Sequence, residues 1–97
     1  MKSYASIEEI EGKFVTCELE MIPLEDSRVL DFSDKETCMI DIPVYMIVPV
    51  VSTFKQGDII VVSHEGGEVS AVCYKDELEK ERRTKIIAEI LNKIRNY

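Results

Sequence analysis

Four side chains of this chain could bind a metal ion or act as a nucleophile and base. They are the three cysteines and the single histidine: Cys17, Cys38, His64 and Cys73. Thiolate and imidazole are the ligands that tetrahedral zinc prefers, and structural sites usually carry them in local pairs about two to four residues apart. Here the four candidates are separated by 21, 26 and 9 positions. We therefore expect no metal, no cofactor and three reduced thiols.

The cysteines have a simpler role as packing residues. An odd number of cysteines without a close pair argues against the disulfide framework of a small secreted domain. Cys17 and Cys73 lie within apolar, alternating runs, where a free cysteine commonly behaves as a small hydrophobic residue. We expect both to be buried.

Catalysis would need a nucleophile with a base, a pair of carboxylates or a phosphate-binding loop. A couple between His64 and Cys73 is conceivable, because the two face each other across a predicted hairpin. The position of His64 beside the Glu65-Gly66-Gly67 turn favours an exposed side chain instead. The two glycines indicate a turn, and they do not make a phosphate cradle. We predict that the protein is not an enzyme.

A calcium loop is the remaining metal-site hypothesis. The acids Asp31, Asp34 and Glu36 lie close together in the sequence. They lack the Asp-x-Asp-x-Asp-Gly order and the glutamate at the twelfth position that such loops use. We expect a solvated loop.

Composition limits the class of protein and of partner. The chain has 97 residues, of which 45% are hydrophobic and 32% charged, as in a single small soluble domain. The net charge is −7, and residues 1–75 alone carry fourteen acids against six bases. Phosphate backbones require positive charge, so we expect no nucleic-acid partner. No apolar stretch approaches the roughly 20 residues of a membrane span, and charged residues follow the start. We expect a cytoplasmic protein with no membrane partner.

Alternation of apolar and polar residues predicts strands. From Phe14 onward one side of the chain is apolar and the other polar, the pattern of a half-buried antiparallel strand. An opening run at 3–10 and a turn at 11–13 complete a hairpin, and a second hairpin spans 59–74. The sequence predicts a mainly β fold with one helix: a small five-stranded antiparallel meander or barrel, SH3-like or OB-like in size, with a C-terminal α-helix. Residues 1–75 form the β-barrel-like domain with a polar loop at 23–36, and residues 76–97 form the C-terminal helix of the same domain.

The terminal helix has two unlike halves. Asp76 is the expected N-cap, with Glu79 as its capping-box partner. The second half carries an apolar stripe of Ile86, Ile87, Ile90, Leu91 and Ile94. Residues 79–85 are expected to stay solvated and to form ion pairs four residues apart, Glu79 with Arg83 and Glu81 with Lys85. We expect the stripe to dock on the open end of its own barrel; a second copy of the chain is the alternative.

The most apolar segment is also the candidate partner surface. It comprises Val44, Tyr45, Met46, Ile47, Val48, Val50 and Val51. Pro43 and Pro49 cannot donate ladder hydrogen bonds, so the segment is expected to cross an open end of the sheet or to lie along an edge. The side chains either fold inward over that end or form a binding patch, and the inward arrangement is favoured because large exposed patches are rare.

Several stretches together resemble an uncharacterised bacterial family, the domain of unknown function 3006. The matching stretches are residues 7–15, Pro43 to Pro49, Gln56-Gly57-Asp58, and the helix with Asp76, Thr84 and Lys85. The chain differs from the family in its longer 23–36 segment and in reading Glu8-Glu9-Ile10-Glu11 near the start. The resemblance implies a compact β-barrel-like domain of bacterial origin with no assigned activity, whose relatives accompany metallo-β-lactamase-type hydrolases.

These observations favour a non-catalytic protein-interaction module whose partner is an unknown protein or the chain itself. The alternatives are a nucleic-acid-binding small barrel, and a metal-binding or accessory subunit of a hydrolase.

Overall fold

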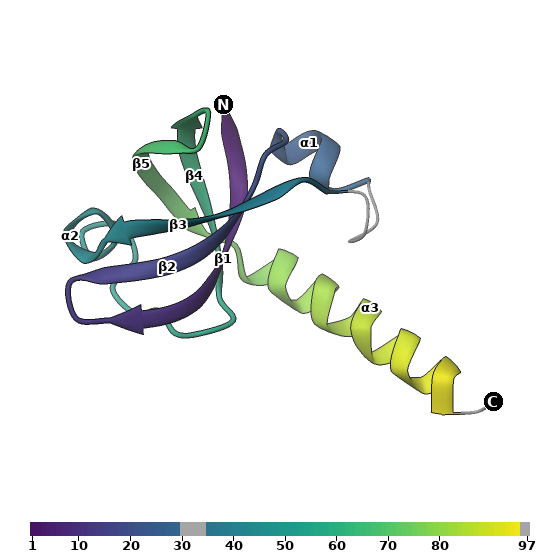
Figure 1. The fold of residues 1–97 in the computed structure, drawn as a ribbon. Coiled ribbons are helices and arrows are strands. Elements are labelled where there is room, and N and C mark those ends of the chain that lie inside the picture. Colours follow the sequence, from purple (N-terminus) through teal and green to yellow (C-terminus); the bar gives the residue numbers. More distant parts are fainter. Residues whose placement is uncertain (30–34, 96–97) are drawn as a thin grey trace.

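The computed structural model describes residues 1–29 and 35–95, and within them five strands form one antiparallel sheet (Figure 1). The strands are β1 (Lys2–Glu11), β2 (Phe14–Glu20), β3 (Thr37–Pro43), β4 (Ile59–Glu65) and β5 (Glu68–Lys75). Two short helices, α1 (Leu24–Ser27) and α2 (Val44–Ile47), precede the long C-terminal helix α3 (Glu77–Arg95). The mainly β fold with one long terminal helix is therefore confirmed. Among the described helices, none has the length and apolar content required to cross a membrane.

The sequence predicts a meander or a barrel, and the five-stranded sheet is curved and open, so it does not close into a barrel. The strand order is β3-β2-β1-β4-β5, which leaves β3 and β5 at opposite edges. Helix α2 packs against both edge strands. Its flanking prolines explain the arrangement, because Pro43 and Pro49 cannot donate the hydrogen bonds that would extend β3 toward β5. Side chains of a helical turn therefore cover this end of the core.

Both predicted hairpins are confirmed. Gly12, with φ +56°, turns β1 into β2, while Gly66 and Gly67 turn β4 into β5 with φ +58° and +95°. Two consecutive positive φ angles are those of a type I′ turn, whose twist matches that of the flanking strands. Along β2 the alternating apolar residues are buried, as expected for a strand with one core face.

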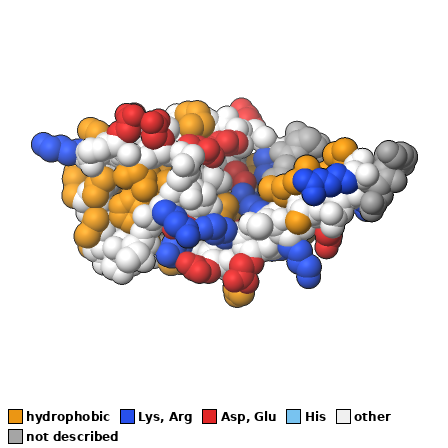
Figure 2. Space-filling view, turned by 90° about the horizontal axis from the view of Figure 1, so that it is seen from below, with side chains coloured by type: hydrophobic (Ala, Val, Ile, Leu, Met, Phe, Trp, Pro, Cys, Tyr) orange, Lys and Arg blue, Asp and Glu red, His pale blue; other side chains and the backbone are white. Residues whose placement is uncertain are grey.

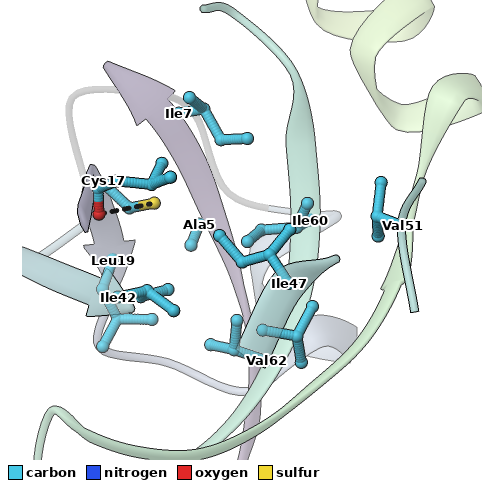
Figure 3. Close-up of a cluster of buried hydrophobic side chains, with 11 residues drawn as sticks. Ala5, Ile7, Cys17, Leu19, Ile42, Ile47, Val51, Ile60 and Val62 are labelled. Carbon is cyan, nitrogen blue, oxygen red and sulfur yellow. Dashed lines mark hydrogen bonds between the residues drawn. The ribbon is translucent and has the colours of Figure 1, made fainter. Parts of the chain in front are cut away.

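The core lies on the concave face of the sheet (Figure 3). Its buried members are Ala5, Ile7, Val15, Cys17, Leu19, Ile42, Ile47, Val51, Ile60, Val62 and Val72. A second, smaller cluster of Tyr4, Leu24, Ile59 and Val61 lies on the other face, and Cys73 packs against it. Strand β4 is thus buried on both faces, which explains its uninterrupted run of apolar residues.

The structure divides the predicted partner surface. Ile47 and Val51 are buried in the core, and Val44 and Met46 are half-buried against it. Only three members of the segment are exposed: Tyr45, Val48 and Val50. The segment therefore mainly closes the end of the core, as the inward arrangement predicts.

Helix α3 projects away from the sheet (Figure 1), and the molecule is elongated, with extents of 46 × 24 × 20 Å. The predicted N-cap is confirmed, since the Glu79 N–H donates to Asp76 Oδ1 at 2.9 Å. The expected docking of the apolar half is wrong. Ile87, Ile90, Leu91 and Ile94 are about half exposed or more. Glu79 and Arg83 in the polar half, which were expected to be solvated, are buried. The reason is that basic side chains of the polar half pair with buried carboxylates of the β domain.

Candidate functional site

A buried cluster of charged and polar side chains holds the first half of α3 against the end of β2 and against α1. We call it the anchor cluster, and its members are Glu20, Ser27, Glu79, Arg82 and Arg83. Four of these are almost inaccessible, with exposed fractions of 6% for Glu20, 0% for Ser27, 5% for Glu79 and 7% for Arg83. Buried charges require paired partners, and the cluster supplies them from three separate elements.

Arg83 is the centre of the cluster. Its Nη1 donates to Glu20 Oε2 at 2.8 Å and its Nη2 to Glu20 Oε1 at 3.2 Å, a two-pronged contact. Its Nε donates to Glu79 Oε1 at 3.2 Å, which confirms the predicted Glu79–Arg83 pair. The Ser27 hydroxyl donates to Glu20 as well. Paired donors that fit the carboxylate fix both distance and direction, so the arginine orients the helix as well as attaching it.

Glu79 accepts hydrogen bonds from two arginines and does not complete a capping box. Arg82 Nε donates to its two carboxylate oxygens at 2.9 and 3.0 Å, in addition to the contact from Arg83. Burial alone would raise the pKa of Glu79, but the hydrogen bonds from the two arginines outweigh it and hold the pKa below its usual value. The N–H of Asp76, which a capping box would satisfy with Glu79, donates to the Ile59 carbonyl at 2.8 Å instead.

Tyr4 joins the anchor cluster to the sheet. Its hydroxyl donates to Asp76 Oδ2 at 3.2 Å and accepts from Arg28 Nε at 2.9 Å. The guanidinium carbons of Arg28 and Arg83 lie 5.8 and 5.1 Å from the centre of its ring, within the range of cation–π attraction. Burial raises the pKa of Tyr4 above its usual value, so the phenol stays protonated and can donate.

A second ionic contact holds the same half of α3. Lys80 Nζ lies 2.7 Å from the buried carboxylate of Asp58, and Lys75 Nζ lies 4.0 Å from it. The Lys55 N–H donates to Asp58 at 2.8 Å. Burial would raise the pKa of Asp58, but the hydrogen bonds from Lys80 and from the Lys55 N–H lower it below the usual value. Lys80 and Arg83 thus fix the helix at two points of its first turns.

Beyond these contacts the same side of α3 becomes apolar. Lys80, Arg83, Ile87, Ile90 and Ile94 follow one another at spacings of three and four, which places them on one side of the helix. Of the predicted stripe, Ile86 is half-buried, and the other four residues are exposed. From here on the apolar stripe means these four, Ile87, Ile90, Leu91 and Ile94, with exposed fractions of 49%, 48%, 50% and 65%. Figure 2 shows hydrophobic side chains gathered along the projecting helix, with basic side chains beside them.

A hollow of about 300 Å³ joins the anchor cluster to the apolar stripe. Its lining includes Glu18 and Glu20 on β2, Lys35, Thr84 and Ile87. Burial lowers the pKa of Lys35 below its usual value, although its ammonium lies 3.7 Å from Glu20. The hollow marks the point where α3 leaves the β domain.

His64 lies elsewhere, and the expectation that its side chain is exposed is wrong. It is 1% exposed, with Nε2 at 2.9 Å from Ser3 Oγ, while the Gly67 N–H donates to its Nδ1 at 3.2 Å. The Ser3 hydroxyl in turn donates to the Ile22 carbonyl at 2.6 Å. A neutral ring protonated on Nε2 satisfies this chain of hydrogen bonds. Burial, with help from the nearby amino terminus, lowers the pKa of His64.

The structure does not bring the cysteines and the histidine together as ligands. Cys17 is fully buried, and Cys73 is half-buried in the second apolar cluster. Cys38 is also half-buried, with its thiol 3.4 Å from the sulfur of Met21. Within residues 1–29 and 35–95, no three His, Cys, Asp or Glu side chains are grouped so that they could hold a metal ion. Asp31 and Asp34 of the calcium hypothesis lie outside the described residues, and Glu36 is exposed.

The sequence carried one signal for the anchor cluster that its interpretation missed. Glu79, Lys80 and Arg83 lie on the backward continuation of the apolar stripe, and a charged residue in line with a core-facing side is a candidate for a buried ion pair. Its partner Glu20 could not be identified, because Glu18 lies on the same polar side of β2 and the sequence does not distinguish the two.

Comparisons of the chain with protein-family models, curated proteins and solved structures found no match in any of the three. The resemblance to the domain of unknown function 3006 therefore stays a prediction.

Proposed function

We propose that the protein is a non-catalytic interaction module whose partner binds the apolar stripe of α3. The observation that carries this proposal is a 19-residue helix that leaves the β domain with a row of large apolar side chains about half exposed on one side. Contiguous exposed apolar surface on a small protein is typical of a binding site. The spacing of three and four residues is the one that a second helix or an apolar groove receives.

The anchor cluster supports the proposal because it fixes the direction of the helix. A binding helix that is already ordered loses less conformational entropy on association than one that must fold. Arg83 and Lys80 attach the first half of α3 to Glu20 and Asp58. The second half continues from this fixed base and presents its stripe in one direction.

The charge distribution favours a protein partner over a nucleic acid. The β domain is strongly acidic, with six bases against fourteen acids in residues 1–75, and phosphate groups would be repelled by it. Lys93 and Arg95 flank the outer end of the stripe. A partner with an apolar face and an acidic rim fits this surface. The expected cytoplasmic location and bacterial origin remain predictions.

The test is capture of partners by a tagged chain from a lysate of its source cells. The native chain is compared with Ile90→Asp, which places a charge in the stripe. The matched control is Leu78→Asp, because Leu78 is 80% exposed on the same helix and points away from the stripe. We expect the captured proteins to be lost with Ile90→Asp and kept with Leu78→Asp. Equal capture by all three chains would refute the proposed site.

A further inference from the structure

We propose that the occupant of the apolar stripe is the stripe of a second copy of this chain, with the two α3 helices packed antiparallel about a two-fold axis. This inference rests on the proposed function and names its partner. Three features support the pairing. The stripe lies on the same side of α3 that contacts the β domain, its two ends are flanked by opposite charges, and symmetric pairing stops at two copies.

The stripe continues an interface that already exists within the chain. Lys80 and Arg83 face the β domain, and the same side of the helix then presents Ile87, Ile90 and Ile94. Ile87 lines the hollow together with Glu18 and Thr84. A helix laid along the stripe would therefore reach the β domain at this hollow, so its end must suit the groups found there.

The two ends of the stripe carry opposite charge. At the domain end, Arg83 and Lys35 in the hollow pair with the buried Glu20, and Lys80 pairs with Asp58. Glu18 in the lining, with Glu8 and Asp41 exposed on the neighbouring sheet face, leaves that face acidic. At the outer end, Lys93 and Arg95 lie on the two flanks of the stripe. An antiparallel copy brings its own basic end to the acidic domain end of the first, and symmetry repeats the contact on the other side.

A parallel arrangement loses these contacts. It would place Lys93 and Arg95 of the two copies side by side and bring together two β domains, each with a net charge of −8 over residues 1–75. Like charges in such proximity are destabilising. The antiparallel arrangement instead separates the two β domains at opposite ends of the helix pair.

Symmetric pairing also closes the assembly. A stripe that docked on the other exposed apolar side chains, around Tyr45, Val48 and Val50, would leave a free stripe and a free patch on every pair. Such head-to-tail contact adds copies without limit unless it closes into a ring. Pairing the stripe of one copy with the stripe of the other covers both stripes in a single contact, so the assembly stops at two copies.

The length of the stripe sets the register. With the axis between Ile90 and Leu91, Arg95 of the second copy lies level with Ile86, and Lys93 of the second copy lies level with Ala88. At about 1.5 Å per residue, the basic end of the second helix then stops at the hollow without entering the β domain. Each Ile87 meets an Ile94 across the axis.

The first experiment is the mass in solution by sedimentation equilibrium from about 1 µM to about 1 mM, a range chosen because the interface is small. We expect the mass of the native chain to rise with concentration from 11.1 kDa toward twice that value. Ile90→Asp should weaken association at least about tenfold, and Leu78→Asp should leave it unchanged. Circular dichroism verifies that each variant is folded, and Ile94→Asp serves as a second stripe variant. A native monomer throughout, or species larger than a dimer, would overturn the inference.

The second experiment determines the orientation through disulfide cross-linking. Ile87→Cys and Ile94→Cys are prepared as separate variants, and the native chain is the control for its own three cysteines. In the antiparallel pair the two variants cross-link when mixed, because residues 87 and 94 of the two copies lie level and both face the partner helix, whereas each residue lies about 10 Å along the helix axis from its own counterpart. Cross-linking of each variant with itself, without the mixed product, would show parallel helices and overturn the arrangement.

The failures of the two proposals are distinguishable. A native chain that stays monomeric but captures another protein in an Ile90-dependent manner overturns the second copy as occupant and leaves the interaction module standing. A monomer that captures nothing through Ile90 overturns both.

Discussion

Arg83 on α3 donates two hydrogen bonds to the carboxylate of Glu20 at the end of β2, 63 positions earlier in the chain. Both side chains are buried, so each charge depends on the other. This pair fixes the direction in which the terminal helix leaves the domain, whereas the N-cap at Asp76 sets where it begins.

Removing one partner of this pair is expected to be strongly destabilising. Arg83→Met leaves Glu20 buried without its main partner, and we expect the free energy of unfolding to fall by about 3 to 5 kcal/mol. Urea unfolding followed by circular dichroism measures it. Glu25→Gln, an exposed change on α1, is the control and should stay within about 0.5 kcal/mol of the native value. A loss from Arg83→Met as small as that of the control would mean that the pair does not hold the helix.

Stability should fall in mild acid because of His64. Its pKa in the folded chain lies below the ordinary value, so as the pH falls below about 6.5 the unfolded chain takes up a proton before the folded chain does. The free energy of unfolding should therefore decrease from pH 7.5 to pH 5.5, by at most about 1.4 kcal/mol per pH unit for one proton. Urea unfolding at both pH values measures it, and His64→Gln should be less stable at pH 7.5 but nearly independent of pH over this interval. An equal pH dependence in the variant would assign the effect to other groups.

The three thiols should differ in reactivity. Burial, with smaller contributions from Glu8 and Asp41, raises the pKa of the Cys17 thiol to about 12, so it carries almost no thiolate at pH 8. Cys38 and Cys73 are only half-buried. We expect a thiol-specific reagent to modify two cysteines of the folded chain within minutes and the third only after urea unfolding. Mass spectrometry of the peptides identifies the protected residue, and early modification at Cys17 would show that this part of the core opens readily.

Single-stranded DNA and RNA should not bind at physiological salt. The acidic β domain cannot neutralise phosphates and release their counterions. Fluorescence anisotropy with labelled mixed-sequence oligonucleotides is the measurement, and the chain at low salt serves as the comparison. Micromolar binding that weakens steeply with added salt would restore the nucleic-acid alternative.

The parts of the fold that local pattern governs could be predicted from the sequence. The alternation along β2 and the glycine turns of both hairpins depend on residues a few positions apart, and each was found as expected. The N-cap at Asp76 is equally local. Closure of the sheet depends on β3 and β5, which are distant in the sequence, so local pattern could not decide between the predicted meander and the predicted barrel.

Only part of the candidate site could be predicted from the sequence, because the apolar stripe and the anchor cluster depend on different information. The apolar stripe could be predicted from helical spacing alone. Burial of Glu79 and Arg83 requires Glu20 from β2 and Ser27 from α1, and nothing within the helix specifies those partners. His64 was misplaced for the same reason, since Ser3, which meets its ring, lies 61 positions away. Charged and polar residues are buried when distant partners satisfy them, and periodicity does not report such partners.

The central position of β1 has a consequence for how the chain folds. β1 pairs with β2 through a tight turn, but its other neighbour, β4, begins at Ile59. Each hairpin can form by local contacts, whereas joining Ala5 to Ile60 closes a loop of more than fifty residues and costs more chain entropy. We therefore expect docking of the two hairpins along β1 and β4 to be the slow step of folding. Truncation of side chains along this seam should retard refolding, and truncation at the hairpin ends should mainly speed unfolding.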